Sequence, residues 1–169
     1  VLLRELAAGR IADGALVERA ILARLRQMTE EEFAAYDGGG EGLYHRVYDA
    51  VRRCATVEEL LAAVKTKRYT AARLRRMVLS AWLGLPKAPE TVPYARVLAA
   101  NETGRALLRQ MRKAGAPVLT KAADVAALGS GAEALFRREA GYTDLYTLAY
   151  TDLAQAVPGS DWRLTPMMK

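Results

Sequence analysis

A chain of 169 residues with 51% hydrophobic and 26% charged residues can bury one core or two small ones, and this mixed composition excludes the disordered class. The lone Cys54 excludes an intramolecular disulfide, and no apolar run reaches the roughly 18 residues of a membrane span, so we expect a cytoplasmic protein. The net charge of +6 is uneven. Residues 65–123 hold 13 Lys/Arg and 2 Asp/Glu, whereas residues 1–64 hold 8 and 11 and residues 124–169 hold 4 and 6. Such a basic middle third is typical of a surface that meets a polyanion.

The first half of the chain has the spacing and the start signals of helices. Thr29 with Glu32 and Thr56 with Glu59 match the Ser/Thr-x-x-Glu capping box, so each pair predicts a helix start. The glycines at 38–40 predict a joint between helices. They complete neither of the glycine-rich phosphate-binding signatures, and a helix rather than a strand precedes them.

A helix is predicted from Thr70 to Gly84, because apolar residues between them recur at i, i+3, i+4, i+7 and i+8. The prolines at 86, 89 and 93 that follow predict an extended linker. We therefore expect a helical region over residues 1–85 and a small α/β region with C-terminal helices over 86–169, or alternatively one continuous C-terminal domain of a larger protein.

Beyond the linker, short strands and helices alternate. Residues 94–98 and 118–120 predict short strands, Asn101 predicts the N-cap of a helix running to about residue 113, and Gly115 and Pro117 predict its end. Alanine-rich helices are predicted over about 121–128 and 132–153, with an irregular tail after them. The predicted fold class is mainly α, with a small α+β C-terminal part that contains one or two short strands.

Residues 65–76, here called the basic segment, hold six basic residues and no acidic one. Cations that neutralise phosphates release counterions, and an exposed aromatic can stack on an unpaired base, so this pattern suits RNA. A solvated helix face is the alternative, but no Asp or Glu between Lys65 and Lys87 balances the charge. The predicted RNA-binding residues are Lys65, Thr66, Lys67, Arg68, Tyr69, Thr70, Arg73, Arg75 and Arg76.

A second basic cluster supports this interpretation. Arg105, Arg109 and Arg112 follow one another at i, i+4 and i+7 and therefore share one helix face, with Lys113 beside them. We add these three arginines to the predicted RNA-binding residues. Two basic faces can line one groove, so we expect the two clusters to form its walls.

Catalytic signatures are missing from the sequence. His45 is the only histidine, so neither a catalytic triad nor a two-histidine nucleotidyl-transfer motif can form within the chain. Cys54 has no second histidine to act as its base and is interpreted as a small packing residue. The glutamates at 30–32 fall in the first turn of a predicted helix, where they complement the helix dipole. We predict no catalytic residue and no metal site.

Several strings occur together in a known order: Glu41-Gly42-Leu43 with Arg46, Glu59-Leu60 followed by the basic segment, Pro93-Tyr94, Arg96-Val97-Leu98, Asn101 with Gly104-Arg105, residues 117–121, and Thr143-Asp144-Leu145-Tyr146. Over roughly residues 18–150 the chain resembles the C-terminal region of the bacterial tRNA(Met) cytidine acetate ligase family. The run Lys-Thr-Lys-Arg-Tyr-Thr within the basic segment is the most specific part of this resemblance.

The resemblance implies an enzyme that uses ATP to activate acetate as acetyl-adenylate and then acetylates the wobble cytidine of elongator tRNA(Met). In that family ATP (with Mg) and acetate are handled by an N-terminal nucleotidyltransferase-like domain with a His-x-Gly-His motif. Because the chain starts at Val1 without an initiator Met and contains one histidine, we expect that domain to be missing. The chain would then be a tRNA-binding domain without a cofactor, inactive by itself.

Two other classes of protein remain open. The helices before and after residue 65 could form a stand-alone helix-turn-helix module that binds DNA, although such readers place Asn, Gln or Arg along the second helix rather than in a long basic joint. A purely structural interaction domain is the third hypothesis, and it predicts partner binding that is insensitive to salt.

Overall fold

The computed structural model describes residues 2–37, 42–85 and 91–169. The predicted glycine joint at 38–40 and the predicted linker prolines at 86 and 89 lie outside these ranges. The fold is mostly helical with a few short parallel strands, which confirms the predicted mainly α class. The chain divides into two compact units, one of residues 1–89 with 148–151 and the other of residues 90–147 with 152–169. Each unit is described by itself.

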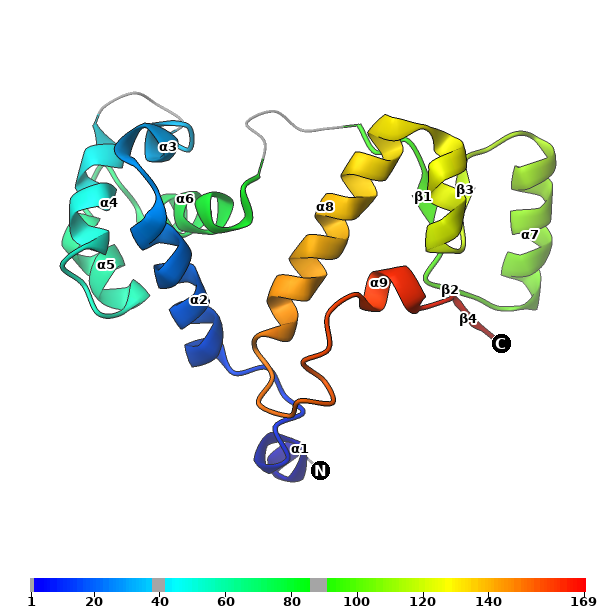
Figure 1. Cartoon of the computed structure of the whole chain (residues 1–169), viewed down its shortest axis with the longest axis horizontal. Helices are drawn as coiled ribbons and strands as arrows, with labels where there is room; N and C mark the ends of the chain where they lie inside the picture. Colours follow the sequence, from blue (N-terminus) through cyan, green and yellow to red (C-terminus); the bar gives the residue numbers. More distant parts are fainter. Residues whose placement is uncertain (1, 38–41, 86–90) are drawn as a thin grey trace. The chain divides into compact units, whose positions relative to one another are not determined.

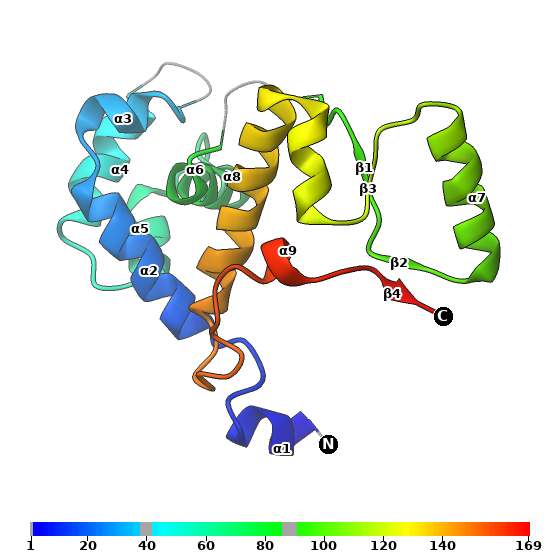
Figure 2. The same cartoon turned by 45° about the vertical axis from the view of Figure 1, so that its right-hand side comes forward.

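The first unit is a set of short helices (Figure 1). In chain order they are α1 (Leu2–Ala7), α2 (Gly14–Gln27), α3 (Glu30–Ala34), α4 (Leu43–Val51), α5 (Val57–Val64) and α6 (Ala71–Leu83). Helix α4 packs against both α3 and α5, and α2 packs against α6 (Figure 2). The basic segment covers the loop between α5 and α6 and the first half of α6.

Local capping interactions explain where these helices begin and end. Thr29 and Glu32 form the complete predicted capping box at α3. Thr56 caps α5 as predicted, but the Glu59 carboxylate accepts the backbone N–H of Ala55 rather than that of the cap residue. Helix α6 ends at Gly84, whose φ of +63° is a left-handed conformation that glycine adopts without a side-chain clash.

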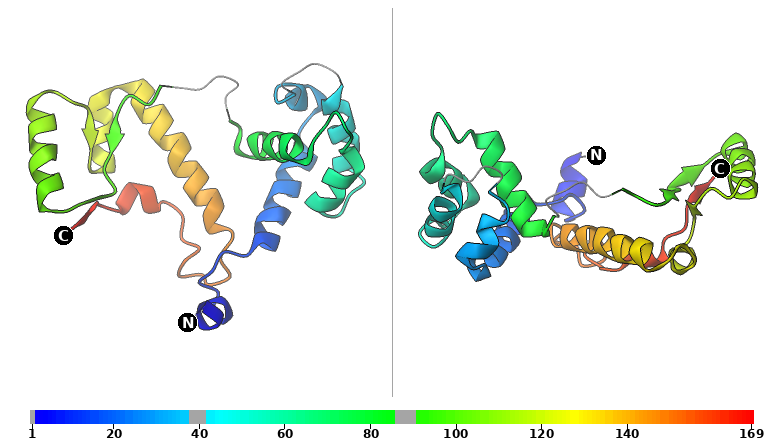
Figure 3. Two further views of the ribbon diagram at one scale, coloured as in Figure 1. Left: turned by 180° about the vertical axis from the view of Figure 1, so that it is seen from behind. Right: turned by 90° about the horizontal axis from the view of Figure 1, so that it is seen from above.

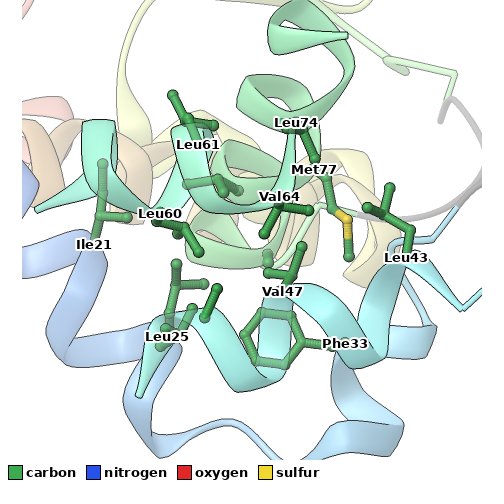
Figure 4. Packing of buried hydrophobic residues seen from close by; sticks show 14 of the residues in the cluster. Ile21, Leu25, Phe33, Leu43, Val47, Leu60, Leu61, Val64, Leu74 and Met77 are labelled. Carbon is green, nitrogen blue, oxygen red and sulfur yellow. The ribbon is translucent and has the colours of Figure 1, made fainter. Parts of the chain in front are cut away.

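Apolar residues from five helices form the core of the first unit (Figure 4). The most deeply buried side chains come from α2, α3, α4, α5 and α6, and they include Leu25, Phe33, Val47, Leu60 and Leu74. Burying a side chain of this size stabilises a fold by about 1.5–3 kcal/mol. This core fixes the orientation of α5 and α6, and therefore the positions of the cations between them.

The second unit combines short strands with helices, as Figure 3 shows. Its elements are β1 (Ala95–Arg96), β2 (Ala99–Ala100), α7 (Glu102–Lys113), β3 (Val118–Leu119), the 3-10 helix η1 (Ala122–Leu128), α8 (Ser130–Thr147), α9 (Ser160–Arg163) and β4 (Met167–Met168). Strand β1 pairs in parallel with β3, and β2 pairs in parallel with β4. A smaller core contains Tyr94, Leu119, Val125 and Phe136.

Three predictions for this unit were wrong. Its described residues form four short strands rather than one or two, because β2 finds a partner in the tail that was predicted to be irregular. The tail also contains α9, which Arg96 holds through Asp161. The last long helix ends at Thr147 instead of residue 153, since residues 148–151 belong to the first unit, where the carbonyl of Ala149 accepts the N–H of Asp13 at 2.6 Å.

Candidate nucleic-acid interface

The loop of the basic segment is held by its own threonines. The backbone N–H of Tyr69 donates to the Thr66 hydroxyl at 3.0 Å, and the N–H of Thr66 donates to the carbonyl of Tyr69 at 3.1 Å. Thr70 is the N-cap of α6, and its hydroxyl accepts from the N–H of Arg73 at 3.3 Å. Both hydroxyls act as acceptors here, so each keeps its own hydrogen for donation to a phosphate.

Tyr69 is a core residue, so the prediction of an exposed stacking aromatic is wrong. Its side chain is only 4% exposed and belongs to the core cluster that also contains Leu74. The guanidinium groups of Arg46 and Arg73 lie 5.9 and 5.4 Å from the centre of its ring. A signal for this role was present in the sequence: Tyr69 precedes the N-cap and Leu74 is the fourth helical residue, which is the spacing of a hydrophobic staple.

Two arginines of the basic segment have acidic partners from distant parts of the chain. Arg73 lies 3.5 Å from the carboxylate of Asp37, whose side chain is 2% exposed. Arg75 lies 3.3 Å from the exposed carboxylate of Glu58. We expected no acid to balance this charge, because none lies nearby in the sequence. For these two arginines that expectation is wrong, because folding brings Asp37 and Glu58 next to them. Arg73 is therefore partly structural.

Four cations remain on the surface of the basic segment. Lys65, Lys67, Arg68 and Arg76 are exposed. Of these, Lys65, Lys67 and Arg76 form no ion pair with any residue in the described ranges. Three lie in the loop and one lies on the second turn of α6, and buried neighbours hold the backbone that carries them. They stay predicted phosphate contacts.

The second basic cluster lies on α7, in the other unit. Arg105, Arg109, Arg112 and Lys113 are all exposed, and α7 contributes no buried residue. Arg112 donates to the hydroxyl of Thr120 at 2.5 Å. Because the two basic clusters belong to separate units, the predicted groove between them stays a prediction.

Sequence reasoning missed a polar network inside the second unit. Arg96 pairs with Asp161 at 2.6 Å, and the Thr143 hydroxyl donates to the same carboxylate at 2.6 Å. Burial by itself would raise the pKa of Asp161, but hydrogen bonds from Arg96 and Thr143 outweigh it and hold that pKa below its ordinary value. Burial, followed by a hydrogen bond to Glu139, raises the pKa of the Tyr94 hydroxyl. Arg96, Tyr94 and Thr143 stand in strings that carried the family resemblance.

The two reactive side chains that the sequence singled out, His45 and Cys54, both have neighbours in the fold. His45 pairs with Glu30, and Cys54 is half-buried against the first core. Across residues 2–37, 42–85 and 91–169 no group of three or more His, Cys, Asp and Glu side chains is placed to hold a metal ion. In the same ranges, no helix combines the length and the apolar character needed to cross a membrane.

Comparison with known families identifies the class of protein. The model of the family described as "HIGH Nucleotidyl Transferase" matches residues 2–159, and the chain therefore belongs to this family. A protein of Thermoanaerobacter sp. (strain X514) named tRNA(Met) cytidine acetate ligase is 34% identical over 134 residues, which are 76% of this chain and 32% of the relative. A protein of the same name from Kosmotoga olearia is 40% identical over 109 residues, 60% of this chain and 26% of the relative.

Solved structures of similar fold come from Thermotoga maritima. The apo form of its TmcAL matches 99% of this chain and 44% of that chain, with a TM-score of 0.84 and 23% sequence identity. A second form, bound with alpha-thio ATP, has a TM-score of 0.83 at the same identity. The chain spans about a third of the length of several curated relatives that it matches.

These findings correct one expectation from the sequence. We expected the nucleotidyltransferase domain to be missing from the chain, and this was wrong, because the family model named for that activity matches residues 2–159. The single histidine still means that a motif with two histidines is not formed from these 169 residues. Membership in the family is therefore established by the whole match rather than by that motif.

Proposed function

We propose that this chain binds tRNA as part of an ATP-dependent enzyme that acetylates the wobble cytidine of elongator tRNA(Met). The observation that carries the proposal is the exposure of Lys65, Lys67, Arg68 and Arg76 within twelve residues of a chain whose relatives are named tRNA(Met) cytidine acetate ligases. A tRNA is a folded polyanion, and cations fixed in one place attract its phosphates and release its counterions.

The packing beneath this surface favours binding. Tyr69 is anchored in the core, and Thr66 closes the loop through two hydrogen bonds. The backbone that carries Lys67 and Arg68 is therefore ordered before any ligand arrives. Ordering a loop during association costs free energy, so a loop that is already ordered binds more tightly for the same contacts.

The basic surface also argues against the DNA-binding alternative. Six residues separate α5 from α6, whereas a helix-turn-helix joins its helices by a turn of about three to four residues. Helix α6 contains neither Asn nor Gln, and two of its three arginines, which could also contact base edges, are paired with Asp37 and Glu58. Three of the four exposed cations lie in the loop before α6, outside the helix on which a helix-turn-helix places its base contacts.

The test is a salt series with the 169-residue chain. Binding to elongator tRNA(Met), to a second tRNA and to duplex DNA is measured from low to high salt for the parent and for Lys67→Ala and Arg76→Ala. Each lost phosphate contact should flatten the log–log salt slope by roughly 0.7–0.9. Arg75→Ala is the matched control, because Arg75 is on the same helix but already pairs with Glu58.

The outcomes separate the hypotheses. Arg75→Ala should change the slope less than Arg76→Ala does, and tRNA should bind more tightly than duplex DNA. Unchanged binding by Lys67→Ala and Arg76→Ala would refute the proposed surface, while a preference for duplex DNA would favour the helix-turn-helix hypothesis. A titration with ATP tests whether this chain also binds a nucleotide, as its match to a nucleotidyltransferase family suggests.

A further inference from the structure

The second unit contains a pocket of about 290 Å³ that is mainly apolar. Phe136 and Leu119 are buried residues of its lining, and three strongly exposed side chains also line it: Leu98, Leu164 and Met167, which are 73%, 66% and 64% exposed. Pockets that bind small molecules usually measure about 300–1,000 Å³, so this one has room for one group of the size of a nucleobase. Exposed leucine and methionine at its edge give a flat aromatic ligand two apolar surfaces.

The polar residues of the pocket divide into two sets. Arg96 and Asp161 are bound to each other, so they act as a fixed wall. Thr120 and Lys121 also line the pocket. The Thr120 hydroxyl accepts from Arg112 of α7 and donates to the Asp124 carboxylate at 3.4 Å, which also accepts the backbone N–H of Lys121 at 3.2 Å. Lys121 is exposed and forms no ion pair with a residue in the described ranges. The guanidinium of Arg112 is therefore hydrogen-bonded to Thr120 of the pocket, and the next residue in the chain, Lys121, is a second cation.

Helix α7 extends this positive charge away from the pocket. Arg105 and Arg109 share one helix face with Arg112, and Glu102 is the only acid of α7. A chain of phosphates that binds along α7 would reach Thr120 and Lys121 at the Arg112 end of the helix. The combination of a linear run of cations with an apolar hollow at its end fits an anionic ligand that carries flat apolar groups.

We propose that this pocket takes the base of one unpaired nucleotide of a bound RNA, while Arg112 and Lys121 contact the flanking phosphates. This inference rests on the proposed function, since it assumes that the chain binds RNA. The bases of an A-form duplex are stacked inside the helix, so the pocket accepts a base only from a single-stranded end, loop or bulge. Free nucleotides such as ATP share this chemistry and are the competing source.

The experiment compares three RNA hairpins with the same stem. One is blunt, one carries a short single-stranded overhang, and one carries an overhang of equal length whose residues are abasic, so that the phosphates match. The overhang with bases should bind the 169-residue chain about tenfold more tightly than the abasic overhang. A fluorescent adenine analogue in the overhang should change its emission on binding and report insertion directly.

Protein variants locate the effect. The double variant Leu98→Ala with Leu164→Ala should bring the ratio between the two overhangs close to one, because it removes two exposed walls of the pocket with little consequence for the fold. Leu153→Ala is the matched control, since Leu153 belongs to the same unit, is 83% exposed and does not line the pocket. That control should leave the ratio unchanged.

Each outcome decides one claim. Equal binding of the two overhangs, with the effect of Lys67→Ala on the salt slope intact, overturns the pocket while the proposed function stands. Failure of every hairpin and every tRNA to bind overturns both. If ATP binds and the double variant weakens ATP binding while leaving the overhang ratio unchanged, the pocket belongs to a free nucleotide and the inference is wrong.

Discussion

Replacing Tyr69 tests whether this residue supports the basic segment from below or stacks on RNA. Its ring is 4% exposed in the first core, with Arg46 and Arg73 at 5.9 and 5.4 Å from its centre. Truncating a buried aromatic side chain to alanine costs about 3–5 kcal/mol, and each lost arginine–ring contact adds about 0.5–1 kcal/mol. Tyr69→Ala should therefore lower the free energy of unfolding by at least about 3 kcal/mol, measured by urea denaturation followed by circular dichroism.

A second substitution separates stability from RNA binding. Tyr69→Leu keeps an apolar side chain in the core and should cost about 1–3 kcal/mol, less than Tyr69→Ala. Because the four exposed cations keep their positions, the affinity for tRNA should stay close to that of the parent under conditions where the variant is folded. A folded Tyr69→Leu protein that loses tRNA affinity about tenfold would refute this reasoning and favour a stacking tyrosine.

Three further predictions concern the polar contacts of the two units. Arg73→Ala leaves the Asp37 carboxylate buried without its cation and should lower the free energy of unfolding by about 1–3 kcal/mol, a range kept low because Arg73 is 33% exposed. Adding Asp37→Asn should recover part of this loss in a double-mutant cycle, and strictly additive losses of the two variants would contradict the pairing. Thr70→Ala removes the N-cap of α6 and should cost about 1 kcal/mol in urea denaturation, whereas Thr70→Ser should keep the cap; an equal loss in both would contradict capping. The pKa of Asp161 lies below its ordinary 3.8 in the folded state, so its contribution to stability is complete above pH 3.8 and is lost as the pH falls through the lower folded pKa. Asp161→Asn should remove this acid-sensitive part of the dependence of the unfolding free energy on pH, and an unchanged dependence would contradict a stabilising role for the Asp161 carboxylate.

Features that depend on neighbours in the chain were predictable from the sequence. The capping residue Thr29, the N-cap Asn101 and the terminating Gly84 all act on backbone groups within four residues, so the sequence pattern contains the whole interaction. The basic segment was predicted for the same reason, because closely spaced lysines and arginines can be read directly from the sequence. These signals located most of the helices of the first unit and the start of α7.

Features that depend on distant residues were not predictable in this way. Strand β2 pairs Ala99 with Met167, and two-residue strands made of alanine and methionine carry no alternating pattern to reveal them. The acid that balances Arg73 comes from the segment after α3, and only the folded core brings Asp37 to it. Counting charge along the chain therefore overstated the unbalanced charge of the basic segment by two arginines.

The two units contribute different kinds of interaction to the proposed complex, and salt distinguishes them. Contacts from Lys67 or Arg76 to phosphates weaken as salt rises, because released counterions supply their free energy. Insertion of a base between Leu98 and Leu164 buries apolar surface, which salt affects little by comparison. The preference for an unpaired base over an abasic site should consequently persist at salt concentrations that weaken overall affinity severalfold. If the preference for the overhang with bases instead falls with salt as steeply as the overall affinity does, the overhang contacts only the cations of α7. The pocket would then have no part in RNA recognition.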